Sequence, residues 1–284
     1  MKWRGRRGSS NIEDRRRRPS RSVAGGGIGG LGLIAVLVIG YFLGIDVTPL
    51  LNGGGGGIST PQTVEVTEAD ERMAEFVSVT LADTEDVWTD IFAQQVGEPY
   101  DAPTLVLFKG ATQSACGGAS AATGPFYCPP EEKAFLDTDF FVTMERQLGA
   151  GGDFAAAYVV AHEVAHHVQN ELGILPQVNQ MRRTADEATS NALSVRVELQ
   201  ADCFSGIWAR QVQERFGSLE RGDIEEAMNA AKQIGDDTLA RNAGRAVQPH
   251  TFTHGSSEQR QRWFIRGYES GDLTVCDTFS AQQL

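Results

Sequence analysis

The stretch AHEVAHHVQ, residues 161–169, places three of the chain's five histidines around one glutamate. On an α-helix, residues four positions apart lie one above the other on the same face. His162 and His166 meet this condition, whereas His167 lies on another side of the helix. Two imidazoles at this spacing can bind Zn²⁺, and the adjacent Glu163 can act as general base toward the water of the metal. The stretch therefore predicts half of a hydrolytic zinc site.

A zinc site of this kind needs a third protein ligand, and the next helical segment can supply it. Its sequence ELQAD carries Glu198 and Asp202 at the same four-residue spacing. Such a pair is usually a solvated acidic face, but the residues around this one are apolar. Charges in an apolar helix are costly unless they are paired or bind a cation. We therefore expect Glu198 to be the third ligand and Asp202 to accept a hydrogen bond from the other ring nitrogen of His162.

The elements that position these residues are mostly helical. Apolar spacing, N-cap residues and terminal glycines predict helices over residues 153–172, 190–216, 223–240 and 256–271. Ser256 and Gln259 fit a capping box at the start of the last one. Two more helices are expected within residues 68–95, and two short strands at 104–108 and 133–137. The pattern predicts an α+β fold, predominantly helical, with a small β-sheet.

The N-terminal part has a different composition. Residues 1–22 contain nine of the 25 basic residues, although the formal net charge of the chain is −12. Residues 23–45 carry no charge, and as a helix they would rise roughly 34 Å, enough to span a bilayer. The positive-inside rule then predicts a cytoplasmic basic tail (1–22), one transmembrane signal anchor (23–45), a Gly-rich flexible linker (46–63) and an extracytoplasmic domain (64–284).

Two other interpretations of the N-terminal part exist. A cleaved signal peptide would need a small-residue cleavage site after the apolar run, but the sequence DVTPLLNGGGGG has none. A nucleic-acid-binding tail would also explain the arginines, but the adjacent apolar run favours a membrane role. We therefore expect no nucleic-acid partner and a single-pass protein of the inner (cytoplasmic) membrane, with its N-terminus in the cytoplasm and its catalytic domain periplasmic or otherwise extracytoplasmic.

The four cysteines all follow the apolar run, so export would allow them to form disulfides. Cys116 and Cys128 bracket a Gly-rich loop, which leaves Cys203 and Cys276 for each other. A cysteine-based metal site is the alternative, but none of the four has the close C-x-x-C spacing that is typical of one. We expect two disulfides.

Several motifs together resemble one family over almost the whole chain. They are KWRGRR (2–7), GPFYCP (124–129), AHEVAHHVQ (161–169), ELQADCFSGIWA (198–209) and HGSSEQRQRWF (254–264). The set is similar to the putative neutral zinc metallopeptidases, which are bacterial membrane-anchored proteins. The resemblance implies a zincin-like fold with glutamate as third zinc ligand. The sequence departs from the family where it has Ala165 in place of a frequent glycine and Ser256 in place of a frequent threonine; neither is a proposed ligand.

The other histidines have less defined roles. His167 is expected to be a core histidine or to support the site. In other zincins, a histidine or tyrosine from a later segment stabilises the oxyanion, and His254 could do the same here. A capping or loop role for His254 is the alternative. No sequence feature singles out His250.

The sequence therefore predicts a zinc metallopeptidase that acts on a protein or peptide substrate, with Glu163 as general base. An extended substrate could pair with the strand around Ala134–Asp137 if that strand lies at a sheet edge. Two alternatives remain: a non-catalytic zinc-stabilised protein-binding domain at the cell envelope, and a zinc hydrolase of a non-peptide amide. The sequence does not identify the substrate, the cleavage preference, the oligomeric state or any latency.

Overall fold

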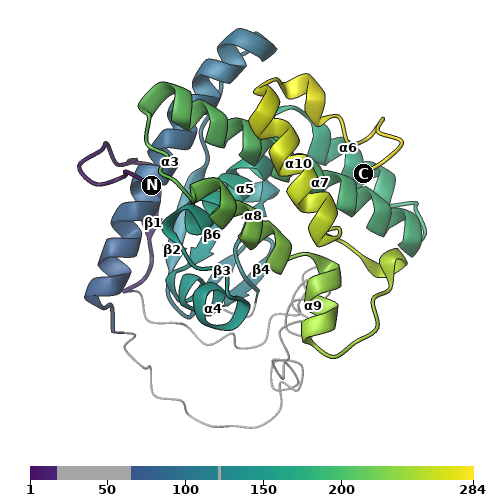
Figure 1. Ribbon diagram of the computed structural model, residues 1–284, viewed down its shortest axis with the longest axis horizontal. Coiled ribbons are helices and arrows are strands. Elements are labelled where there is room, and N and C mark those ends of the chain that lie inside the picture. The colour runs from purple at the N-terminus through teal and green to yellow at the C-terminus, as the bar shows by residue number, and fades with distance from the viewer. Residues whose placement is uncertain (18–64, 121–122) are drawn as a thin grey trace.

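The computed structural model describes residues 1–17, 65–120 and 123–284 (Figure 1). The predicted anchor (23–45) and linker (46–63) lie outside these residues. Within the described ranges, no helix combines the length and the apolar composition needed to cross a membrane. The fold is mixed α+β and predominantly helical, as predicted.

Two helices hold most of the predicted site residues, and both are surrounded by other elements. Helix α5 (Asp153–Glu171) is buried on nearly all sides and ends at Gly173, whose φ of 73° suits glycine. Helix α7 (Glu187–Phe216) packs against it and ends at Gly217, as predicted. Between them lies the short helix α6 (Ile174–Arg182), which was not predicted. Pro176 lies in the first turn of α6, where no backbone donor is needed.

The number of helices differs from the prediction in two segments, 223–240 and 68–95. The segment expected as a single helix over 223–240 is α8 (Asp223–Gln233) followed by α9 (Asp236–Asn242). The break at Gly235 is explained by packing, because a Cβ there would lie 2.5 Å from the backbone nitrogen of Ser257. Conversely, α3 (Glu68–Ile91) is one continuous helix that passes into a π-helical turn (Phe92–Val96), and no glycine or proline interrupts it.

The main sheet contains four strands in the order β1-β2-β6-β5. They are β1 (Ile12–Asp14), β2 (Thr104–Phe108), β6 (Lys133–Asp137) and β5 (Phe126–Cys128). β1, β2 and β6 are parallel, and β5 pairs antiparallel with β6. β2 and β6 confirm the two predicted strands. The expectation that residues 134–137 form a sheet edge is wrong, because β6 pairs with a strand on each side.

A two-stranded hairpin and one further helix complete the part around the sheet. The hairpin consists of β3 (Ala111–Ser114) and β4 (Gly117–Ser120), and α4 (Thr138–Leu148) follows β6 directly. The four cysteines lie in two pairs at disulfide distance, Cys116–Cys128 with 2.09 Å and Cys203–Cys276 with 1.92 Å between the sulfurs. These are the expected pairs.

Residues 1–17, which we call the N-terminal arm, are part of the folded body. The arm supplies β1, and in Figure 1 its purple trace lies beside α3. Lys2 donates a backbone hydrogen bond to the carbonyl of Ser218, and Arg16 is only 4% exposed. This differs from the separate basic tail expected for residues 1–22. The sequence pattern could not show the difference, because strand pairing between β1 and β2 joins residues about ninety positions apart.

The last helix, α10 (Ser257–Ser270), begins with the predicted capping box of Ser256 and Gln259 and ends at Gly271. It crosses α7 at very short distance. A Cβ on Gly206 would lie 2.0 Å from the carbonyl oxygen of Phe264, and one on Gly267 would lie 1.9 Å from that of Cys203. Only glycine permits this approach at either position.

We expect Gly267→Ala to lower the free energy of unfolding by about 3 kcal/mol, because α7 and α10 must separate to admit the methyl group. Gly118→Ala is the matched control, since a Cβ there meets only Gln113 Nε2 at 3.9 Å. Chemical denaturation of the two purified variants measures the difference. Equal stability of both variants would contradict the close crossing.

Candidate functional site

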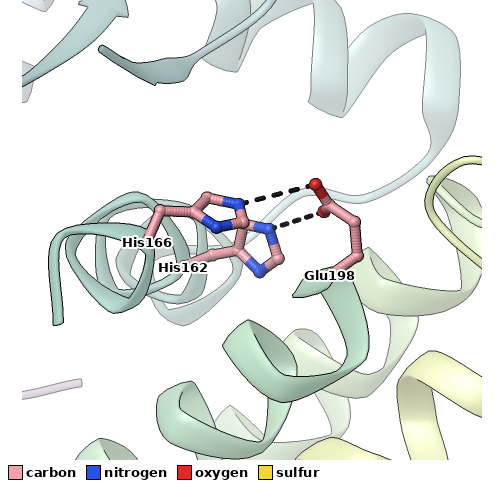
Figure 2. A group of neighbouring side chains, drawn as sticks. All are labelled: His162, His166 and Glu198. Atoms are coloured by element: carbon pink, nitrogen blue, oxygen red, sulfur yellow. Dashed lines mark hydrogen bonds and ion pairs between the residues drawn. The ribbon is translucent and has the colours of Figure 1, made fainter. Parts of the chain in front are cut away.

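The structure brings His162, His166 and Glu198 together. One ligand atom from each of the three lies within 4.8 Å of the others. Figure 2 shows both imidazole rings, which come from α5, pointing toward the carboxylate of Glu198 on α7. The Nε2 atom of His162 lies 3.1 Å from Glu198 Oε2, and that of His166 lies 3.6 Å from Glu198 Oε1. The i, i+4 spacing of the histidines explains why their rings face the same point.

Both rings turn their second nitrogen toward a buried acceptor. His162 Nδ1 lies 3.0 Å from Asp202 Oδ1, and His166 Nδ1 lies 2.9 Å from the side-chain oxygen of Gln169. His166 Nδ1 is hydrogen-bonded to Gln169, whereas His162 Nδ1 lies at ion-pair distance from Asp202 without an aligned hydrogen bond in the described part of the chain. Nε2 of each ring therefore faces the Glu198 carboxylate. Without a metal, a proton on His162 makes the contact between its Nε2 and Glu198 a hydrogen bond of 3.1 Å. Once that proton is lost, two Nε2 lone pairs and a carboxylate converge on one point. The donor set therefore fits a divalent metal, and nitrogen with carboxylate ligands suits Zn²⁺.

Asp202 is the centre of a buried network behind the candidate ligands. Its side chain is fully buried, and Arg260 donates to both of its oxygens, from Nε to Oδ2 at 2.8 Å and from a terminal nitrogen to Oδ1 at 2.9 Å. Tyr158 donates its hydroxyl proton to Oδ1 at 2.5 Å. Burial raises the pKa of Asp202, but Arg260 and His162 outweigh it and keep the pKa below its ordinary value. Asp202 is therefore an anion that can orient His162.

The protonation of the candidate site follows from burial and nearby charges. Burial lowers the pKa of His162, but the carboxylates of Asp202 and Glu198 raise it to about 9. For His166, burial dominates and lowers the pKa. Burial would raise the pKa of Glu198, but His166 and His254 hold it well below its usual range. Without a metal, one proton on His162 thus partly compensates the negative charge of the site.

Glu163 lies beside this group on α5. It is 7% exposed, and burial raises the pKa of its carboxyl to about 7. The smaller effect of His162 lowers this pKa, and that of Glu198 raises it. None of the residues in the described ranges donates a hydrogen bond to this carboxylate in the structure. A carboxylate with a pKa near neutrality and free oxygens can take up and release a proton at physiological pH.

His254 is held near the site by Asp236, the first residue of α9. Its Nδ1 lies 3.2 Å from Asp236 Oδ1, and Oδ2 of Asp236 accepts backbone hydrogen bonds from Thr253, His254 and Gly255. Burial lowers the pKa of His254, but Glu198 and Asp236 outweigh it and raise it above its ordinary value. The His254 ring thus lies in the electrostatic environment of Glu198, and its raised pKa favours the charged form.

The remaining histidines lie apart from this group. The ring of His167 donates from Nε2 to the carbonyl of Asp101 at 2.6 Å and accepts at Nδ1 from the hydroxyl of Tyr127 at 2.9 Å. These bonds occupy both nitrogens, in agreement with a core role. His250 is exposed on a short 3₁₀ helix (Pro249–Thr251).

Four residues that support the candidate site were not predicted from the sequence: Tyr158, Gln169, Asp236 and Arg260. A signal exists for Arg260, because it shares its helical face with Trp263, Phe264 and Gly267, and an arginine on an apolar face needs a buried partner. Asp236 follows Gly235 at a helix start, which is only a weak signal. For Tyr158 the signal is its position one turn before His162 on the same face.

Comparisons with known proteins identify the family to which the chain is similar. The model of the family described as "Putative neutral zinc metallopeptidase" matches residues 1–279. The chain is 46% identical to the uncharacterized protein YpfJ of Escherichia coli strain K12, over 98% of this chain and 99% of that protein. It is 45% identical to the uncharacterized protein Rv2575 of Mycobacterium tuberculosis strain H37Rv, over 65% of each chain. No solved structure matches the chain.

The family match includes the N-terminal arm, both helices with candidate ligands and the Arg260 segment, and the family implies Zn²⁺ as cofactor and a peptide or protein as substrate. From this extent of the match we conclude that the chain belongs to the putative neutral zinc metallopeptidase family.

Proposed function

We propose that this protein hydrolyses peptide bonds with Zn²⁺ held by His162, His166 and Glu198. The observation that supports it best is the orientation of the two rings, whose Nε2 atoms face one carboxylate while their Nδ1 atoms face Asp202 and Gln169. Bound Zn²⁺ supplies Lewis-acid polarisation of the scissile carbonyl and lowers the pKa of water. Three protein ligands, which leave a fourth position open for water, and the adjacent Glu163 favour a catalytic over a purely structural site.

The protein's own residues have distinct roles in this proposal. Glu163 takes the proton of the attacking water and delivers it to the leaving amine, for which a pKa of about 7 is well suited. Asp202, held by Arg260 and Tyr158, fixes the ring of His162. The His254 ring, charged and oriented by Asp236, donates a hydrogen bond to the oxyanion that develops on the carbonyl.

The substrate is proposed to bind as an extended strand. In the described part of the sheet, β5 is the outermost strand on one side, and it contacts α5. Backbone groups at such an edge can pair with a peptide. β5 thus replaces residues 134–137 as the candidate edge. A helix with the metal ligands beside this edge also supports a zincin-like fold. Membrane attachment through residues 23–45 stays a prediction.

Zinc content and cleavage of casein by the purified full-length protein test the proposal together. We expect about one zinc per chain and cleavage that a chelator abolishes. Stoichiometric zinc without cleavage of casein or of a peptide library would instead favour a non-catalytic zinc-binding domain. A protein that cleaves no peptide but releases products from an envelope extract would favour hydrolysis of a non-peptide amide.

We expect zinc binding to release about one proton per chain at pH 8, because His162, with a pKa of about 9 in the metal-free protein, must lose its proton to become a ligand. Below pH 9 the apparent zinc affinity should therefore fall about tenfold for each unit of decreasing pH. Isothermal titration in buffers with different ionisation enthalpies measures the number of protons. Zinc binding without proton release at pH 8 would contradict a protonated His162 in the metal-free protein.

We expect His254→Ala to reduce kcat for peptide cleavage by about 10²-fold or more while zinc content stays unchanged, because a donor to the oxyanion is lost. His250→Ala is the matched control, since this exposed histidine lies only four residues away. Steady-state kinetics and metal analysis of both variants make the comparison. Equal activity of the two variants would contradict a role of His254 in stabilising the oxyanion and would favour its alternative role in the loop.

A further inference from the structure

The N-terminal arm has no part in the proposed chemistry, yet it is built into the body. Its strand β1 pairs with β2 in register, Ile12 beside Leu105 and Asp14 beside Leu107. The backbone nitrogen of Leu105 donates to the carbonyl of Asn11 at 2.8 Å, and that of Arg15 donates to the carbonyl of Leu107 at 2.7 Å. The arm thereby covers the edge of β2, which would otherwise expose unpaired backbone groups.

The arginines of the arm have acidic partners on α3. Arg6 binds Asp83 through two hydrogen bonds of 2.7 and 2.8 Å, and the Asp83 side chain is only 4% exposed. Arg16 is equally buried and donates to the carboxylate of Glu71 at 2.9 Å and to the carbonyl of Asp70 at 2.8 Å. A buried charge that loses its partner costs several kcal/mol. These arginines therefore stabilise the body through the carboxylates of α3.

Close packing accompanies these ion pairs. Met1 is part of the hydrophobic core, and the ring of Trp3 meets that of Phe76 edge to face with centroids 5.6 Å apart. A Cβ on Gly8 would lie 2.7 Å from Ser78 Oγ, and the next residue, Ser9, donates its backbone N–H to the Ser78 carbonyl. The arm thus packs closely against α3 at Trp3, Gly8 and Ser9.

This packing is incompatible with a membrane between the arm and the body. Strand pairing and these ion pairs act only at contact distance, whereas the hydrocarbon core of a bilayer is about 30 Å thick. We propose that the N-terminal arm and residues 65–284 lie on the same side of the membrane as one folded unit. This inference does not depend on the peptidase activity. It replaces the expectation of a single-pass protein whose N-terminus lies in the cytoplasm and whose domain lies on the other side of the membrane.

The arginines of the N-terminal arm then have a different role from the one that the positive-inside rule predicts. The positive-inside rule treats arginines near an apolar segment as free to interact with the cytoplasmic membrane surface. Here Arg6, Arg7 and Arg16 are bound by Asp83, Glu85, Asp86 and Glu71. Their charge is explained by the acidic face of α3. The family match, which begins at residue 1, includes the arm together with this face.

Cysteine accessibility tests the inference in cells. Ser10 in the arm and Ala188 at the start of α7 are both exposed, and all four native cysteines are paired. The variants Ser10→Cys and Ala188→Cys are treated with a membrane-impermeant maleimide before and after lysis of spheroplasts, and the parent protein serves as background. We expect both to react before lysis, or both only after it. Reaction of one before lysis and of the other only after it would overturn the inference.

Charge reversal tests the docking itself. In the full-length purified protein, Arg6→Asp should lower the melting temperature by about 10 °C, because the buried Asp83, whose pKa burial raises to about 7 even beside Arg6, then loses both hydrogen bonds from the guanidinium. The double variant Arg6→Asp/Asp83→Arg should recover most of this loss. Arg4→Asp is the matched control, since Arg4 is exposed in the same segment. An Arg6→Asp protein as stable as the Arg4→Asp protein would show that the arm is not docked.

Discussion

Replacing Glu163 with glutamine is expected to reduce kcat/KM for peptide cleavage by about 10³-fold or more and to leave zinc bound. Glutamine has nearly the same shape, but its amide cannot take a proton from the attacking water. The carboxyl is suited to that task because burial raises its pKa to about 7. None of the proposed zinc ligands is changed, so the metal content should stay at that of the parent protein.

Steady-state kinetics and metal analysis of the same preparation measure both parts of this prediction. Glu171→Gln, at the end of the same helix, is the matched control and should keep full activity. Full activity in Glu163→Gln would contradict its role as general base. Loss of zinc in that variant would instead show that Glu163 is needed to hold the metal.

Glu198→Ala is expected to abolish both zinc binding and cleavage, because only two histidine ligands would remain. The loss of zinc affinity should exceed the roughly 10–100-fold effect that is typical of residues behind the ligands. Asp202→Asn should fall within that smaller range, since it keeps all three proposed ligands and changes the residue that His162 shares with Arg260 and Tyr158. The two variants thus separate a ligand from the residue that orients it.

Competition with a chromophoric chelator measures the zinc affinity of these variants. Glu214→Ala on the same helix α7 is the matched control, because Glu214 is exposed and pairs only with Arg210 one turn away among the interactions described. Tight stoichiometric zinc binding by Glu198→Ala would mean that the third ligand is another residue. Circular dichroism of each variant ensures that lost affinity is not lost folding.

The sequence predicted the parts of the site that depend on local periodicity. His162 and His166 share a helical face by spacing alone, and Glu198 and Asp202 do so on the next apolar helix. A helix that is apolar on most sides must be buried, so its charged residues must meet partners. The capping box at Ser256 and the glycine at residue 217 marked helix ends for the same local reason.

The sequence could not predict the parts that depend on contacts between distant segments. Arg260 reaches Asp202 only because Gly206 and Gly267 let α7 and α10 approach each other. The break before Asp236 depends on packing of Gly235 against Ser257. Neither contact can be predicted from the spacing of apolar residues along one helix. The basic arm is the clearest case, since its arginines were interpreted by composition, and the partners of Arg6 and Arg16 on α3 lie more than fifty positions away.

The arm also determines which protein should be assayed. A fragment that begins after the Gly-rich segment would lack β1 and leave Asp83 without Arg6. Such a fragment should be less stable and more prone to associate through β2. Activity measurements therefore belong on the full-length chain in mild detergent.

Cleavage of a peptide library by the full-length protein, before and after removal of zinc, tests the central claim most directly. Mass spectrometry of the products identifies the bonds that are broken. We expect cleavage by the untreated protein, none after chelation, recovery on addition of one equivalent of Zn²⁺, and none by Glu163→Gln under any of these conditions. Cleavage that persists after complete removal of zinc, or that Glu163→Gln carries out at the parent rate, would contradict the claim.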